Sequence, residues 1–129
     1  YQAVQKKDQG IEVNALSFKT FVSPNRVKYV VAQEGEDIYD IAIKTDRWPG
    51  ELQRYNEITE EQRIKTGQKV YLQPKRKKAA KDYSTHTVQE GETLHTIAQQ
   101  YAIHTQHLRR RNGISKGQEP KPGDVLKLR

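Results

Sequence analysis

The sequence contains no cysteine and no methionine, and it has a single tryptophan among 129 residues. Without cysteine, neither disulfides nor thiolate metal sites are available to stabilise the fold. No apolar run approaches the roughly 20 residues that a transmembrane helix needs, so no membrane span is predicted. Because the chain begins at Tyr1 and lacks methionine, we expect an excised fragment or a mature product. Any targeting or catalytic region of a longer protein would then lie outside it.

Positive charge is unevenly distributed along the chain. The formal net charge is +7, of which residues 1–28 contribute +3 and residues 73–84 contribute +4. Residues 29–72 carry −3, residues 85–128 carry +2, and Arg129 supplies the remaining charge. This distribution argues against a basic binding face shared by the two halves of the chain.

A unit of 44 residues occurs twice. Residues 29–72 and 85–128 align without a gap at a constant offset of 56, with 14 identical positions. A short unit used twice is more often a reader of a repetitive ligand, or a stacking element, than an active site. Each unit is close to the smallest size at which a core holds without disulfides or metal.

The repeat divides the chain into four segments. They are an N-terminal extension or linker (1–26), module one (27–73), a basic linker (74–84) and module two (85–129). The alternation at Ile11, Val13, Leu16 and Phe18 indicates a strand or an ordered lead-in, and Pro24-Asn25 indicates a turn. The basic linker has little to bury and many like charges, so we expect it to be extended and solvated.

The first half of each unit has a strand followed by a helix. In module one the alternation of Val27, Tyr29 and Val31 predicts a half-buried strand. Asp37 is a suitable N-cap for the following helix, and Thr93 is its counterpart in module two. Apolar residues spaced i, i+3 and i+4 then form one helical stripe in each copy: Ile38, Ile41, Ala42, Leu94, Ile97 and Ala98.

The second half of each unit predicts another short helix and a closing strand. Pro49 suits the first turn of this helix in module one. Asn56 and Asn112 tolerate the left-handed conformation that ends many helices, so we expect the helices to stop there. The closing strands keep their apolar residues on one face: Val70, Leu72, Leu126 and Leu128.

These residues resemble the LysM module. Thr87-Val-Gln-Glu-Gly-Glu-Thr-Leu-His-Thr-Ile-Ala98 is similar to the opening signature of that family, and Pro122-Gly-Asp-Val-Leu-Lys-Leu128 is similar to its closing strand. Module one resembles the family through Val31–Ala42 and Lys65–Leu72. The similarity covers 88 of the 129 residues. No single motif is strong, but the ordered set repeated twice is specific.

The resemblance implies both a fold and a function. LysM modules are α+β, βααβ units that bind β-1,4-linked N-acetylglucosamine polymers such as peptidoglycan and chitin. Two modules with a basic linker are similar to the C-terminal region of bacterial cell-wall glucosaminidases. The resemblance therefore implies a non-catalytic chain without cofactors in the cell envelope, periplasmic or extracellular, which anchors a cell-wall hydrolase to glycan strands.

The family's glycan groove lies between the strand–helix loop and the helix–strand loop. Glycine allows the backbone to approach a sugar closely, free N–H groups at a helix start can bind an acetamido carbonyl, and isoleucine can cover a sugar face. Asp37, Trp48 and His104 depart from the family pattern, and module one has Ile64 where module two has Pro120. The loops of module two match the family better, so we expect module one to bind more weakly. The groove maps to Gly35, Glu36, Asp37, Ile38, Asn56, Glu57, Ile58, Thr59, Gly91, Glu92, Thr93, Leu94, Asn112, Gly113, Ile114 and Ser115.

Simpler structural roles compete with several of these assignments. Gly35 and Gly91 could serve only as turn residues, and the two asparagines could serve only to end helices. Trp48 could stack on a sugar, but a single tryptophan beside proline more often packs into a small core, and we expect packing. The apolar helix stripes are expected to be core.

Catalysis and metal binding are not predicted. The carboxylate pair Glu34/Glu36 recurs as Glu90/Glu92, but it lies on an open turn where nothing would raise a pKa for glycoside hydrolysis. His104 and His107 are three residues apart, yet their counterparts in module one are not histidines and no further ligand is evident.

Two basic runs leave other functions open. Lys75–Lys78 and Arg109–Arg111 could bind phosphates, which would make the chain a nucleic-acid-binding tandem module. A protein-interaction scaffold that has lost its sugar sites is a further alternative. Solvated charge is the simpler interpretation of both runs, and glycan binding is the favoured function.

Overall fold

Each module folds as strand, helix, helix and strand, which confirms the predicted α+β, βααβ architecture. The structure is a computed structural model that describes residues 18–129, so the predicted alternation at Ile11, Val13 and Leu16 lies outside the described residues. No helix in the described part is long and apolar enough to cross a membrane. The N-terminal extension contributes β1 (Phe21–Val22). Module one contains β2 (Lys28–Val31), α1 (Ile38–Thr45), α2 (Pro49–Asn56) and β3 (Lys69–Tyr71). Module two contains β4 (Thr85–Thr87), α3 (Leu94–Tyr101), α4 (Thr105–Arg111) and β5 (Val125–Lys127).

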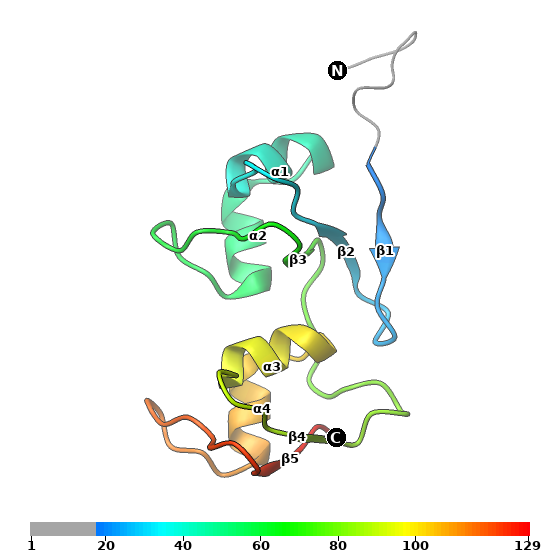
Figure 1. Ribbon diagram of the computed structural model, residues 1–129. Coiled ribbons are helices and arrows are strands. Elements are labelled where there is room, and N and C mark those ends of the chain that lie inside the picture. Colours follow the sequence, from blue (N-terminus) through cyan, green and yellow to red (C-terminus); the bar gives the residue numbers. More distant parts are fainter. Residues whose placement is uncertain (1–17) are drawn as a thin grey trace, which may run out of the picture.

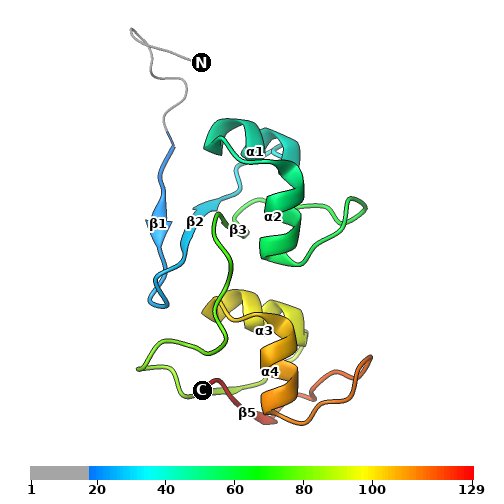
Figure 2. The same ribbon diagram turned by 180° about the vertical axis from the view of Figure 1, so that it is seen from behind.

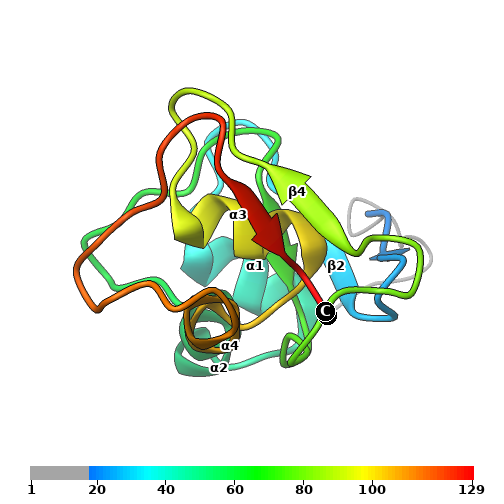
Figure 3. The ribbon, with the colours of Figure 1, turned by 90° about the horizontal axis from the view of Figure 1, so that it is seen from below.

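The two modules are stacked in the same orientation. Module one lies above module two in Figure 1, and the view from behind shows the same stacking (Figure 2). Seen along the stack, α3 projects onto α1 and α4 projects onto α2 (Figure 3). The helices of module two therefore face the lower side of module one.

Both sheets are antiparallel. In module one the strand order is β1-β2-β3, and in module two β4 pairs with β5. Val30 lies opposite Val70, and His86 lies opposite Leu126. The extension therefore adds an edge strand, and the predicted turn at Pro24-Asn25 joins β1 to β2.

The first helix of each module starts at the predicted cap. The Asp37 side chain accepts a hydrogen bond from Asp40 N, and the Asp40 side chain accepts one from Asp37 N. Thr93 and Thr96 form the same reciprocal capping box at α3. These bonds satisfy N–H groups that lack partners within the helix.

Each module has its own apolar core. The predicted helix stripes are buried in both copies, as the helical period of 3.6 residues requires. The alternate apolar residues of the closing strands are buried as well, as the strand period of two requires. The core of module one consists of Val30, Ala32, Ile38, Ile41, Ala42, Leu52, Val70 and Leu72. The core of module two consists of Ala79, Val88, Leu94, Ile97, Ala98, Ile103, Leu108, Leu126 and Leu128.

The strand prediction for module one chose the wrong face. Val30 and Ala32 point into the core of module one. Val27 is buried in a separate cluster, together with Tyr71 of module one and Ala102 of module two. Because successive side chains alternate across a strand, Val30 is buried on one face of β2, and Tyr29 and Val31 are partly buried on the other. Alternation alone could not predict this, because the second face is partly covered by Phe21 of the extension and Ala102 of module two.

The basic linker is not simply solvated, which corrects the sequence-based expectation. The Lys75 side chain is fully buried, and Ala79 belongs to the core of module two. Arg76 forms a backbone bridge with Ile103. Asn25, in the β1–β2 turn, donates its side-chain amide to Lys78 O and Ala102 O. The linker is therefore held against both the N-terminal extension and module two.

The predicted left-handed helix ends fall one residue later. In module one the left-handed residue is Glu57, with φ of 54°. In module two Asn112 has φ of −105°, and Gly113 is left-handed with φ of 62°. The asparagines are required for a different reason, which involves their side chains.

Candidate functional site

The strand–helix loop of each module is fixed by a glutamate. Glu92 accepts hydrogen bonds from Gln89 N at 2.7 Å and from His86 Nε2 at 2.8 Å. The bond from His86 is the main reason that the pKa of Glu92 is lowered. In module one Glu36 accepts from Gln33 N and from Lys44 Nζ. Burial is the largest single influence and raises the pKa of Glu36, but the hydrogen bonds from Lys44 and Gln33 N and the charge of Lys44 together outweigh it, so the pKa is lowered.

These carboxylates are therefore ionised at neutral pH and already bonded to the protein. A general acid for glycoside hydrolysis needs a raised pKa. The predicted loops offer a sugar their backbone instead. Gly35 and Gly91 have φ of 80° and 86°, a conformation that favours glycine, and a Cβ at either position would meet nothing within 4 Å.

The two predicted loops of each module lie next to each other. In module two Glu119, from the α4–β5 loop, accepts a hydrogen bond from Leu94 N at 2.7 Å. In module one the Tyr39 hydroxyl lies 3.4 Å from Glu60 Oε1 across the same gap. No sequence motif points to Glu119, which occupies an N–H group that an acetamido carbonyl could use. Arg63 is its counterpart at the offset of 56, and arginine has no acceptor for such a bond.

Asn56 fastens helix α2 to strand β3 through its side chain. Its amide donates to Leu52 O at 2.8 Å and to Tyr71 O at 2.9 Å. Its side-chain oxygen accepts from Tyr71 N at 2.7 Å and from Gln99 Nε2 at 2.8 Å. Asn56 is only 1% exposed. The side chain is therefore fully engaged within the protein.

Asn112 makes the same clamp in module two. Its amide donates to Leu108 O and Lys127 O, and its oxygen accepts from Lys127 N. Both asparagines consequently hold the helix end against the closing strand, a role that simple helix termination did not predict.

The isoleucines of the second loop are only partly buried. Ile58 packs against the core of module one, and Ile114 packs against the core of module two. The Thr59 N–H donates to the Gln62 side chain, and Ser115 O accepts from Arg109. Ile58 and Ile114 thus keep apolar surface on the loop that the resemblance assigns to sugar.

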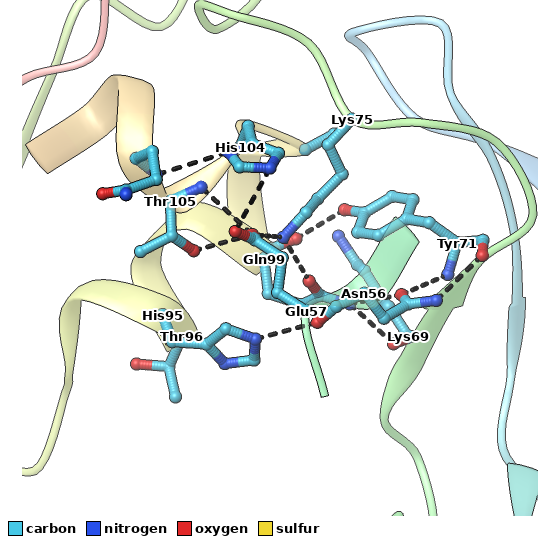
Figure 4. A network of polar contacts seen from close by, with 12 residues as sticks. Asn56, Glu57, Lys69, Tyr71, Lys75, His95, Thr96, Gln99, His104 and Thr105 are labelled. Carbon is cyan, nitrogen blue, oxygen red and sulfur yellow. Dashed lines mark hydrogen bonds and ion pairs between the residues drawn. The ribbon is translucent and has the colours of Figure 1, made fainter. Parts of the chain in front are cut away.

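Glu57 faces module two and lies at the contact between the modules. Its carboxylate is 2.7 Å from Lys75 Nζ and accepts from Thr105 N at 3.0 Å and Thr105 Oγ1 at 2.7 Å. Figure 4 shows these bonds converging on Glu57, with His104 Nε2 at 3.5 Å. Burial is the largest single influence and raises the pKa of Glu57, but the hydrogen bonds from Lys75 and Thr105 and the charge of Lys75 together outweigh it, so the pKa is lowered. The carboxylate is therefore ionised and bonded to module two.

Gln99 extends the contact between the modules into a network. Its side-chain oxygen accepts from Lys75 Nζ at 2.9 Å, and its amide donates to Asn56 and to Lys69 O. The Tyr71 hydroxyl donates to Gln99 O. Burial lowers the pKa of Lys75, and Glu57 opposes this shift. A buried polar network of this kind is stabilising only when all its members are satisfied, as they are here (Figure 4).

The remaining candidates are not brought into one site. Trp48 is 76% exposed, so the expectation that it packs into the core is wrong. His104 and His107 are adjacent, with ring centroids 5.7 Å apart, but residues 18–129 contain no group of three side chains suited to a metal.

The basic linker lines a pocket of about 620 Å³ that the sequence did not predict. Arg76 donates to Asn25 O and Arg26 O, and Arg129 donates to Ala79 O, so two guanidinium groups are held in place. The cationic lining residues are Arg26, Arg76, Lys77, Lys78, Lys81 and Arg129.

Comparison with known proteins identifies the repeat. The family model of the LysM domain matches residues 30–73 and 86–129. The chain belongs to the LysM family. LysM modules are non-catalytic and generally bind glycans that contain N-acetylglucosamine. They occur in cell-wall-associated, extracellular proteins.

Among solved structures, the chain is similar to two spore cortex-lytic enzymes named SleL. The enzyme from Bacillus cereus is 22% identical with a TM-score of 0.35, over 80% of this chain and 22% of that one. The enzyme from Bacillus megaterium QM B1551 is 20% identical with a TM-score of 0.33, over 78% of this chain and 22% of that one. The LysM chain thus spans about a fifth of each enzyme. No match was found among curated proteins.

Proposed function

We propose that this tandem LysM chain anchors a cell-envelope protein, a cell-wall hydrolase, to the glycan strands of peptidoglycan in the periplasmic or extracellular space. The observation that carries the proposal is the LysM match in both modules, with the two family loops adjacent in each. The chain contributes binding, and the hydrolytic domain is a partner carried elsewhere in the longer protein.

The proposed glycan site in each module is the pair of loops described above. Positive-φ glycines allow a sugar to approach the backbone, and Ile58 and Ile114 provide apolar surface for an acetyl methyl group or a ring face. In module two the ligand must displace Glu119 from Leu94 N to use that donor. Asn56, Asn112 and Glu57 support the site by holding the backbone, since their side chains bond to the protein.

Titration of the chain with chitopentaose, followed by amide chemical shifts, tests the proposal. Shallow sites bury little area, so binding to a short oligomer should be weak. Shifts are expected in Gly91–Leu94 and Asn112–Ser115, with smaller shifts in the loops of module one. Ile114→Asp should weaken binding because it places a charge on the sugar face, and Ile58→Asp should have a smaller effect.

Ile43→Asp is the matched control, because Ile43 is 81% exposed and lies outside both loops. It should bind chitopentaose as the native chain does. Native binding in Ile114→Asp would show that the glycan lies elsewhere, and the absence of any shift would remove the glycan assignment.

The pocket of the basic linker supports a second candidate, binding to a phosphate polymer such as nucleic acid. Six cationic side chains surround it. Binding to phosphate releases counterions, so it weakens steeply as salt rises, whereas binding to a neutral glycan does not. Binding of short DNA at physiological salt that is tighter than binding of peptidoglycan would reverse the order of the two candidates.

A further inference from the structure

A cleft of about 580 Å³ lies between the two modules, and neither module forms it alone. One wall is the α2–β3 loop of module one, and the other is helix α3 of module two. We propose that this cleft binds the carboxylate-bearing peptide stem of peptidoglycan. The cleft would thereby make the tandem prefer stem-bearing glycan over a neutral sugar polymer. The site presupposes the glycan binding proposed above, because the stem would reach the cleft on a strand held by module one.

The charge of the cleft fits an acidic ligand. Its lining includes Arg63, Lys65 and Lys69 and contains neither aspartate nor glutamate. Module one is acidic as a whole, yet three of the six cations among residues 29–72 line this cleft. Among residues 18–129, Arg63 and Lys65 form no ion pair, and both side chains are exposed. They can therefore bind carboxylates without breaking an internal salt bridge.

The amides of the cleft add donors for a peptide. The side-chain oxygens of Gln62 and Gln68 accept from Thr59 N at 2.7 Å and Lys65 N at 3.1 Å. Within the described residues their NH₂ groups make no hydrogen bond, so each can donate to a peptide carbonyl. The oxygen of each side-chain amide thus holds the loop, and its NH₂ group remains able to bind a ligand.

The wall formed by helix α3 is held by the network between the modules. His95 Nε2 lies 2.9 Å from Asn56 O, and a carbonyl only accepts, so Nε2 carries the proton. In the neutral ring the other nitrogen is then an acceptor, suited to a peptide N–H. Gln99 is fastened to Asn56 and Lys75, which fixes the spacing of the two walls.

The cleft is continuous with the glycan loops of module one. Ile58 lies both on the predicted sugar-binding loop and in the lining of the cleft. A sugar covering Ile58 would therefore direct its substituents toward Arg63 and Lys65. Residues 18–129 contain one junction between modules, so the cleft occurs once in the described part of the chain.

The decisive ligands are a peptidoglycan tetrasaccharide with its peptide stems and the same tetrasaccharide after an amidase has removed them. Hydrolysis leaves a lactyl carboxylate on each N-acetylmuramic acid, so this pair tests the stem itself, and chitopentaose serves as the neutral ligand. At low salt the stem-bearing form should bind the native chain about three- to ten-fold more tightly, as one or two exposed ion pairs allow. Only that form should shift the amides of His95, Thr96 and Gln100. The preference should shrink as salt is raised.

Arg63→Gln and Lys65→Gln should each reduce the preference while leaving chitopentaose binding unchanged. Lys116→Gln is the matched control, because Lys116 is exposed on the corresponding loop of module two, outside the cleft. Equal affinity for the two tetrasaccharides, together with measurable chitopentaose binding, would overturn the cleft site and leave the proposed function standing. Failure of all three ligands to bind would overturn both.

Discussion

The corresponding helical face contacts the other module in module two and is exposed in module one. In module two it carries His95, Gln99 and His104, and these polar side chains contact the lower side of module one. At the offset of 56, module one carries Tyr39, Ile43 and Trp48, which are 47%, 81% and 76% exposed. The polar face is covered and the apolar face is not. At this face docking therefore follows polar complementarity, beside the apolar cluster that Val27 and Tyr71 form with Ala102 of module two.

The lower sides of the modules differ in a corresponding way. The clamp formed by Asn56 recurs at Asn112, because each module needs its helix held against its closing strand. The following residue is Glu57 in module one and Gly113 in module two, and only Glu57 has a module beneath it. The shared asparagines maintain the fold of each module, and the residues that differ, Glu57 in module one and His95 and Gln99 in module two, add the contact between the modules.

The largest effect on this contact is expected from Glu57→Ala. The substitution leaves the ammonium group of Lys75 buried without its carboxylate, and breaking a buried ion pair costs about 3 kcal/mol or more. Hydrogen exchange should report faster opening of α3 and of the β3 edge, with both cores intact. A Glu57→Ala protein with native exchange would show that the pair does not hold the modules together. Glu60→Ala, on an exposed residue of the same module, is the control.

The clamps should differ in strength between the modules. Asn56→Ala removes partners from Leu52 O, both backbone groups of Tyr71 and the Gln99 amide, and we expect a loss of about 3 kcal/mol. Asn112→Ala, on a less buried clamp without the contact to another module, should cost about half as much. Urea denaturation of the two variants measures the difference. Equal losses would indicate that the bond to Gln99 adds nothing.

Acid should weaken the contact between the modules before it unfolds either core. The pKa of Glu57 in the folded chain is below its ordinary value of 4.5, so its contribution is fully present above that pH. This contribution is lost as pH falls through the lowered pKa, at about 1.4 kcal/mol for each unit of depression. The pKa values of Glu36 and Glu92 are lowered as well. The Glu57→Gln variant is therefore needed to separate the contribution of Glu57 from theirs. Stability and exchange at α3 should depend less on pH in that variant, and an unchanged profile would assign the acid sensitivity to the other carboxylates.

Sequence patterns predicted the parts of this fold that are local. The caps at Asp37 and Thr93 and the apolar helix stripes follow from spacing within a few residues, and the structure confirms them. The glycan assignment of the loops came from family resemblance and stays a proposal. The buried state of Lys75 could not be predicted, because a lysine among like charges is normally solvated.

Contacts between polar residues that are far apart in the sequence leave no periodic pattern from which they could be predicted. The resemblance places Glu57 on the family's sugar-binding loop, and nothing in its sequence neighbours indicates Thr105 as a partner. Glu119 was overlooked because a single acid on a loop is unremarkable until Leu94 lies beside it. Trp48 was expected to pack because tryptophan usually does, but the burial of a side chain depends on the surface that faces it.

The smallest effect is expected on the exposed face of module one that carries Tyr39, Ile43 and Trp48. Ile43→Gln should change the stability of the chain by less than about 0.5 kcal/mol, because an exposed side chain loses no packing. The reciprocal change Gln99→Ile should cost about 1–3 kcal/mol, since it removes partners from Lys75 and Asn56 in a buried network. Thermal unfolding of the two variants provides the measurement. If Ile43→Gln proved as costly as Gln99→Ile, the face of module one would be buried in solution, and polar complementarity would not explain which face docks.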